Sequence, residues 1–166
     1  YNLPIVITRF CNIYGSGQLN FSAIIPDAIS SAFGYSTFIP RSNGSLIRDF
    51  IYVEDVIDLY MLIAIELKKD PARITGQIFN AGTNSPISMR ELLKIIYSLI
   101  DNMAEYERVL KLMKDNITIG EINCQYMDFE KANKFFGWSP KMNLNEGLSQ
   151  TIKWFEKYLS AKNRCK

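Results

Sequence analysis

Residues 4–10 read Pro-Ile-Val-Ile-Thr-Arg-Phe, and this stretch decides the fold class that we expect. Apolar and β-branched residues follow one another from Ile5 to Thr8, which is typical of a strand buried on both faces of a sheet. Strands of that kind occur in α/β proteins, where helices cover both faces of a parallel sheet. We therefore predict an α/β fold with this strand in its sheet.

The rest of the sequence alternates between helical and strand-like patterns, as an α/β fold requires. The periodicity predicts two short strands over 77–80 and 121–127, and helices over 21–33, 54–67, 88–100, 105–113, 128–137 and from 143 onward. Ser88 and Glu91 form a capping-box sequence at the start of one helix. No internal repeat or flexible linker divides the chain, so we expect residues 1–166 to form a single unit.

Two patterns make sharper predictions about packing. The Asn43-Gly44 pair lies between strand-like runs at 37–39 and 46–53, which predicts a β-hairpin because both residues tolerate positive φ. The helix over 54–67 is apolar almost all round, with acids in its first turn and two lysines after its end. We expect that helix to be deeply buried.

The composition argues against several kinds of site. The chain has no histidine and three widely separated cysteines, so neither zinc binding nor histidine-based catalysis is expected. The charges sum to only +2, with no run of Lys and Arg longer than two, which argues against nucleic-acid and membrane partners. The longest apolar run, 59–65, is far shorter than the ~18 residues that cross a bilayer. We expect a cytoplasmic protein without a metal.

Three polar residues are candidates for binding a ligand: two asparagines at the carboxyl ends of strands, where α/β proteins bind ligands, and an arginine on the second strand of the predicted hairpin. Asn12 follows the first strand, Asn80 ends a later one, and Arg48 precedes the apolar run 50–53. Asparagine amides and a guanidinium suit phosphate and sugar oxygens. Each residue also has a structural alternative, because the asparagines can bond their own turns and Arg48 can pair with Asp49 or another acid. The residues alone leave these alternatives open.

Two other features are weaker signals. Gly15 and Gly17 follow the first strand, but the loop lacks the third glycine of a dinucleotide fingerprint and any Lys-Ser/Thr pair. Arg41 lies in the predicted hairpin, where an exposed charge is the ordinary expectation.

Several motifs taken together resemble one family. They are R-F-C-N-I-Y-G-S-G (9–17), I-I-P (24–26), N-G-S-L-I-R-D-F-I-Y-V-E-D-V (43–56), F-N-A-G (79–82) and F-F-G-W-S-P (135–140). In this order they resemble the C-terminal half of the NAD-dependent epimerase/dehydratase family, the extended short-chain dehydrogenases. Within that family, segments 18–29, 41–44 and 121–128 look most similar to the branch that dehydrates CDP-glucose.

The resemblance implies the C-terminal portion of an extended short-chain dehydrogenase, namely the end of a Rossmann sheet plus a smaller mixed α/β subdomain that binds the substrate. Because the chain begins with Tyr1 rather than Met, we expect residues 1–166 to be part of a longer protein. The absent N-terminal part would bind NAD and carry the family's catalytic Tyr-x-x-x-Lys, so no catalytic residue is expected in this chain. The whole protein is expected to form a homo-oligomer.

The same resemblance implies a nucleotide-sugar substrate and a role for each of six residues. Asn12 would hold the diphosphate-sugar, Arg48 the diphosphate, and Asn80 the nucleotide side. The base or ribose would be bordered by Ile24, Ile39 and Arg41. The implied reaction is oxidation at C4 by NAD, loss of water across C5 and C6, and return of the hydride to C6.

Two positions depart from the family pattern. Ala23 stands where the dehydratase branch usually has a basic residue, and the stretch 118–121 (Thr-Ile-Gly-Glu) lacks the arginine that many relatives have there. Alternative readings are a 4-epimerase or reductase of the same family, or a non-catalytic binding module. Residues upstream of Tyr1 would distinguish the two enzyme readings, because a dehydratase needs an additional acidic pair and an epimerase does not.

Overall fold

The structure is a computed structural model that describes residues 3–113 and 120–164. Its helices are α1 (Ile24–Ala32), α2 (Val53–Lys69), α3 (Pro71–Ile74), α4 (Met89–Leu99), α5 (Met103–Met113), α6 (Glu130–Phe136) and α7 (Leu144–Arg164). Its strands are β1 (Ile7–Phe10), β2 (Asn12–Tyr14), β3 (Ile47–Arg48), β4 (Phe50–Tyr52), β5 (Ile78–Ala81), β6 (Ile87–Ser88) and β7 (Cys124–Gln125). The predicted α/β class is confirmed.

Two of the three small sheets are parallel pairs. β1 pairs with β5, with Ile7 opposite Ile78, and β2 pairs with β4, with Asn12 opposite Phe50. In the third sheet, β3 lies between antiparallel β6 and parallel β7. The crossover from β2 to β4 contains α1, and the crossover from β1 to β5 contains both α1 and α2, as expected for parallel strands.

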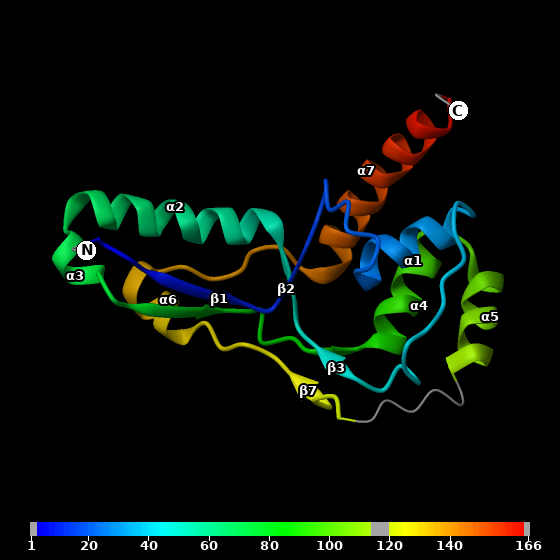
Figure 1. The fold of residues 1–166 in the computed structure, drawn as a ribbon, viewed down its shortest axis with the longest axis horizontal. Helices are drawn as coiled ribbons and strands as arrows, with labels where there is room; N and C mark the ends of the chain where they lie inside the picture. The colour runs from blue at the N-terminus through cyan, green and yellow to red at the C-terminus, as the bar shows by residue number, and fades with distance from the viewer. Residues whose placement is uncertain (1–2, 114–119, 165–166) are drawn as a thin grey trace.

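Two hydrophobic cores lie at opposite ends of the molecule. One is built from β1, β5, α2, α3 and α6, and the other from α1, α4, α5 and α7 (Figure 1). Strand β4 contributes to both because its side chains alternate: Ile51 packs into the first core, and Phe50 and Tyr52 pack into the second. This strand therefore joins the two ends of the molecule.

Several predicted helix boundaries are confirmed. The Ser88 hydroxyl accepts the Glu91 N–H, and the Glu91 carboxylate accepts the Ser88 N–H in return. Gly137 ends α6 with φ of 68°. The Asn143 side chain accepts the Glu146 N–H at 2.9 Å, at the start of α7.

The predicted hairpin at Asn43-Gly44 is wrong. Residues 37–39 form no strand, and β3 pairs with β6 and β7 instead. The Asn43 carboxamide oxygen accepts hydrogen bonds from the Ser45 N–H and hydroxyl, so the pair forms a local turn in which Gly44 has φ of 80°. The Asn-Gly signal located a turn, but the segment before it bonds to helices.

Two predictions of complete burial are also wrong for the described residues. β1 has one covered and one open face: Ile7 is 46% exposed, whereas Phe10 packs against the first core. Helix α2 buries Val56, Leu59 and Ile63 and leaves a second apolar stripe exposed, formed by Ile57, Met61 and Ile65. In residues 3–113 and 120–164, no element covers these apolar surfaces.

The predicted strand over 121–127 is shorter than expected, because only Cys124 and Gln125 pair with β3. Thr118 and Ile119, at the predicted departure from the family pattern, lie outside the described residues. None of the helices in the described part of the chain is long and apolar enough to cross a membrane.

Candidate functional site

A pocket of about 90 Å³ opens between the first turn of α1, the segment 38–42, and the ends of α4 and α5. Its lining includes three of the residues predicted from the sequence, namely Ile24, Ile39 and Arg41. It is completed by Ser22, Asp27, Phe38, Pro40, Ser42, Met89 and Met113. The fold thus brings the predicted base-side residues together, and most of the other lining residues are apolar.

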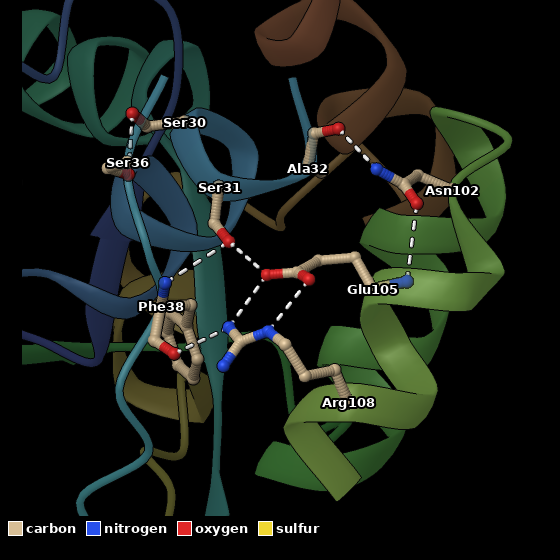
Figure 2. A network of polar contacts seen from close by, with 8 residues as sticks. All are labelled: Ser30, Ser31, Ala32, Ser36, Phe38, Asn102, Glu105 and Arg108. Carbon is tan, nitrogen blue, oxygen red and sulfur yellow. Dashed lines mark hydrogen bonds and ion pairs between the residues drawn. The ribbon is translucent and has the colours of Figure 1, made fainter. Parts of the chain in front are cut away.

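Helices α1 and α5 hold the segment 38–42 through the backbone N–H and the backbone carbonyl of Phe38. The Phe38 N–H donates to the Ser31 hydroxyl oxygen at 3.1 Å, and the Phe38 carbonyl accepts from the Arg108 guanidinium at 3.0 Å (Figure 2). The Phe38 side chain is buried in the helical core. These contacts place the next residues, Ile39 to Arg41, at the mouth of the pocket.

Glu105 connects the two anchors. Its carboxylate accepts two hydrogen bonds from Arg108, at 2.7 and 2.8 Å, and one from the Ser31 hydroxyl at 2.9 Å (Figure 2). The Arg108 hydrogen bonds, and then the Ser31 bond, lower the pKa of Glu105. The result is a charge-assisted network that is ionised at neutral pH and fixes the wall of the pocket.

Asp27 is a pocket residue that the sequence reasoning missed. It lies one turn after Ile24 on α1, so both side chains project from the same side of the helix. Burial raises the pKa of Asp27, and the nearby Arg41 guanidinium opposes that shift. The i, i+3 spacing from Ile24 was the available signal. It could not be used until Arg41 was known to approach from another segment.

Arg48 is held by main-chain and side-chain oxygens of a neighbouring segment. Its guanidinium donates to the carbonyls of Ile47 at 2.8 Å and Ile122 at 2.7 Å, and it lies 3.4 Å from the Glu121 carboxylate. The Arg48 side chain is 15% exposed and that of Glu121 is 53% exposed. The sequence left two structural partners open for Arg48, Asp49 or another acid. The structure shows that the acid is Glu121 and not Asp49.

Asp49 ties together three segments near Asn12. The Asp49 carboxylate, which is fully buried, accepts hydrogen bonds from the N–H and hydroxyl of Thr83. The backbone carbonyl of Asp49 accepts hydrogen bonds from both the backbone N–H and the side-chain amide of Asn12, at 3.1 and 3.0 Å. Asn12 therefore bonds the residue that connects β3 and β4, directly after Arg48, rather than its own turn.

Gly82 allows this close approach. A Cβ atom at residue 82 would lie 2.4 Å from an Asp49 carboxylate oxygen and 2.3 Å from the Met127 carbonyl oxygen.

Burial raises the pKa of the neighbouring Cys11 thiol, and the Asp49 carboxylate raises it further. A reactive cysteine needs a lowered pKa, so the raised pKa of Cys11 argues against a reactive thiol at this position.

Asn80 is separate from the other predicted residues. It lies on the open face of the β1–β5 pair, directly opposite Arg9, and its side chain is exposed. It does not line the pocket that contains Ile24, Ile39 and Arg41. Its predicted contact with the nucleotide side of a substrate stays a prediction.

The described residues do not fit the phosphate cradle of a dinucleotide. Gly15 has φ of 153°, and a Cβ there would lie 2.5 Å from Val53, so packing explains this glycine. The next helix, α1, starts only at Ile24, well beyond the loop, so no helix N-terminus directly follows Gly17. No group of three or more His, Cys, Asp or Glu residues suited to a metal was found in the described part of the chain.

Comparisons with known proteins agree on one family. A family model described as GDP-mannose 4,6 dehydratase matches residues 1–151. The chain is 32% identical over 159 residues to dTDP-D-glucose 4,6-dehydratase of Homo sapiens, covering 93% of this chain and 42% of that protein. It is 29% identical over 163 residues to dTDP-glucose 4,6-dehydratase of Haemophilus influenzae, covering 93% and 46%.

Solved structures show the same similarity. dTDP-glucose 4,6-dehydratase of Bacillus anthracis, in complex with NAD, is 26% identical with a TM-score of 0.71, covering 95% of this chain and 46% of that one. The epimerase Mth375 of Methanothermobacter thermautotrophicus, at 21% identity and a TM-score of 0.77, covers 98% and 46% and shares the fold. The chain thus spans less than half the length of these relatives.

Proposed function

The chain belongs to the GDP-mannose 4,6 dehydratase family of sugar-nucleotide enzymes, and from this membership we propose that it forms the substrate-binding part of an NAD-dependent nucleotide-sugar 4,6-dehydratase. CDP-glucose is the substrate that we propose, on the sequence resemblance of segments 18–29, 41–44 and 121–128. The two named relatives are dTDP-glucose enzymes, so the experiment compares CDP-glucose with other nucleotide sugars.

The observation that carries the proposal is the convergence of Ile24, Ile39 and Arg41 on one pocket. These residues come from two segments and would border the base or ribose. A pocket of about 90 Å³ is smaller than the 300–1,000 Å³ of a complete ligand site, which suits one end of an extended substrate. The remainder of the nucleotide sugar would extend toward Arg48 and Asn12.

Arg48 is proposed to bind the diphosphate. Its carboxylate partner among the described residues, Glu121, is half exposed and lies 3.4 Å from the guanidinium. Because the Glu121 carboxylate is half exposed and 3.4 Å from the guanidinium, this ion pair contributes little, and a diphosphate can compete for Arg48. Asn12 and Asn80 are proposed to bind the sugar and nucleotide sides, with Asn12 held in place by the Asp49 carbonyl.

NAD is proposed to bind to the part of the protein beyond residues 1–166, because the Gly15–Gly17 loop does not fit its phosphates. The cofactor would supply the oxidation at C4 and the reduction at C6. We accordingly propose that residues 1–166 alone have no dehydratase activity and that the whole protein is a homo-oligomer.

The test is product analysis with the complete protein that contains this chain. CDP-glucose, UDP-glucose, dTDP-glucose and GDP-mannose are each incubated with the protein and NAD, and the sugars are identified by mass spectrometry and NMR. A 4-keto-6-deoxy product supports the dehydratase. A 4-epimer as the product would instead identify the protein as an epimerase. Tight nucleotide-sugar binding without any product would identify it as a non-catalytic binding module.

A further inference from the structure

We propose that the Asp27 carboxylate and the Arg41 guanidinium, which line the same pocket, read the edge of the nucleobase and select cytosine over uracil and thymine. This inference rests on the proposed function, because it assigns the base end of the same substrate site. It adds a specificity-determining residue, Asp27, that neither the sequence motifs nor the family resemblance identified.

The two groups are available to a ligand. In the described residues, the Asp27 carboxylate receives no hydrogen bond, although the side chain is half-buried in the first turn of α1. Arg41 is close enough to oppose the effect of burial on the pKa of Asp27, but the two form no ion pair in the described part of the chain. A carboxylate and a guanidinium thus line the same pocket without neutralising each other directly.

The chemistry of the pocket matches one order of donors and acceptors. A carboxylate only accepts hydrogen bonds, and a guanidinium only donates them. Cytosine presents its N4 amino donor beside two acceptors, N3 and O2, so Asp27 can accept from N4 while Arg41 donates to N3 or O2. In the same orientation, uracil and thymine would place the O4 acceptor opposite the Asp27 carboxylate. Their donor on this edge, N3–H, would then lie where cytosine presents the N3 acceptor to Arg41.

The size of the pocket favours a single ring. About 90 Å³ holds a few waters, and Ile24, Phe38 and Ile39 provide apolar surfaces for a flat base. Adenine and guanine also carry amino groups but add a second ring. We therefore infer a pyrimidine, and cytosine is the pyrimidine with the amino group.

The wall that carries Arg41 is preorganised for this task. Phe38 lies three residues before Arg41. Its backbone N–H is bonded to Ser31 and its backbone carbonyl to Arg108 (Figure 2). A wall already held in place costs less to order when a base binds. The Glu105 carboxylate accepts hydrogen bonds from both Ser31 and Arg108, so it serves the network rather than the base.

The experiment measures CDP and UDP binding to the complete protein by titration calorimetry, for the wild type and Asp27→Asn. The wild type is expected to bind CDP about tenfold more tightly than UDP, in the range of one good base contact. In Asp27→Asn the amide can face either base, because it both donates and accepts, so the ratio should fall to about threefold or less. Glu107→Gln removes the same charge from an exposed position on α5 and should retain the wild-type ratio.

The outcomes separate this inference from the proposed function. A CDP preference that survives in Asp27→Asn, or a wild type that binds UDP as tightly as CDP, overturns the role of Asp27 and leaves the nucleotide-sugar site standing. A wild type that binds neither nucleotide overturns both. A thermal melt of each variant confirms that the compared proteins are folded, and Asp27→Ser is the second variant if Asp27→Asn melts early.

Discussion

The Arg108 guanidinium donates a hydrogen bond to the Phe38 carbonyl at 3.0 Å, across 70 residues of sequence. The same guanidinium pairs with Glu105, and Glu105 accepts the hydroxyl of Ser31, which in turn accepts the Phe38 N–H. Helices α1 and α5 therefore hold the segment that leads into Arg41 from both sides. The network therefore contributes to the position of the pocket wall that Ile39 and Arg41 form.

Replacing Arg108 with methionine should destabilise the fold. Arg108→Met keeps most of the apolar stem but removes the bonds to Phe38 and Glu105, leaving Glu105 partly buried without its cation. We expect a loss of about 1–3 kcal/mol in the free energy of unfolding, measured by urea denaturation. Lys134→Met is the matched control, because the exposed Lys134–Glu130 pair should contribute about 0.5 kcal/mol or less. Equal losses in the two variants would contradict the prediction.

The network should also make stability depend on pH in a definite direction. The pKa of Glu105 is lowered in the folded state, chiefly by Arg108, so its contribution is complete above the unfolded pKa of about 4.3. That contribution is lost as the pH falls through the lower, folded pKa. The difference in unfolding free energy between wild type and Glu105→Gln should therefore be constant near pH 7 and shrink in acid. A difference that grows in acid would show that Glu105 is not held as a carboxylate.

Arg48→Ala should affect binding more than stability. If Arg48 binds the diphosphate, its loss should weaken nucleotide-sugar binding by about 2–4 kcal/mol, measured by titration calorimetry on the complete protein. Glu121→Gln is the control: it removes a half-exposed partner at 3.4 Å, so both stability and affinity should stay within about 0.5 kcal/mol. Unchanged affinity in Arg48→Ala would exclude Arg48 from the site and leave it as a link to residues 121–122.

Gly82→Ala should be strongly destabilising because two fixed oxygens stand where its Cβ would lie. The Asp49 carboxylate is held by Thr83 and the Met127 oxygen is part of the backbone, so neither can move without breaking other contacts. We expect a loss of roughly 1–3 kcal/mol or more in urea denaturation. Gly76→Ala meets no atom within 4 Å and carries only the strain of φ at 78°, so it should cost less. A larger loss at Gly76 would contradict this steric account.

Local chemistry in the sequence was sufficient to predict the ends of helices. The Ser88–Glu91 capping box, Gly137 at the end of α6 and the Asn143 cap of α7 each depend on residues within four positions of one another. Such signals act through short hydrogen bonds of the backbone to nearby side chains, so they hold in most tertiary contexts. The α/β class followed in the same way, from the alternation of strand-like and helical segments.

The pairing of distant segments could not be predicted by this route. Asn43-Gly44 correctly marked a turn, but positive φ says nothing about which strands lie beside it, and the segment before the turn bonds to Ser31 and Arg108 instead. The burial of α2 was overestimated for a related reason. An apolar helix face shows what can be covered, whereas the elements actually packed against it decide what is covered.

By itself, the amino-acid sequence determined the α/β class and every helix except α3, and the residues that its family resemblance assigns to a nucleotide sugar stay a prediction. Only the tertiary structure decided that Arg48 meets Glu121 rather than Asp49, and that Asp27 shares a pocket with Arg41. The physical reason is that hydrogen bonds and charges act over a few ångströms of space. Chain folding brings residues such as Arg48 and Glu121, 73 positions apart, within that range, and no local pattern records the encounter.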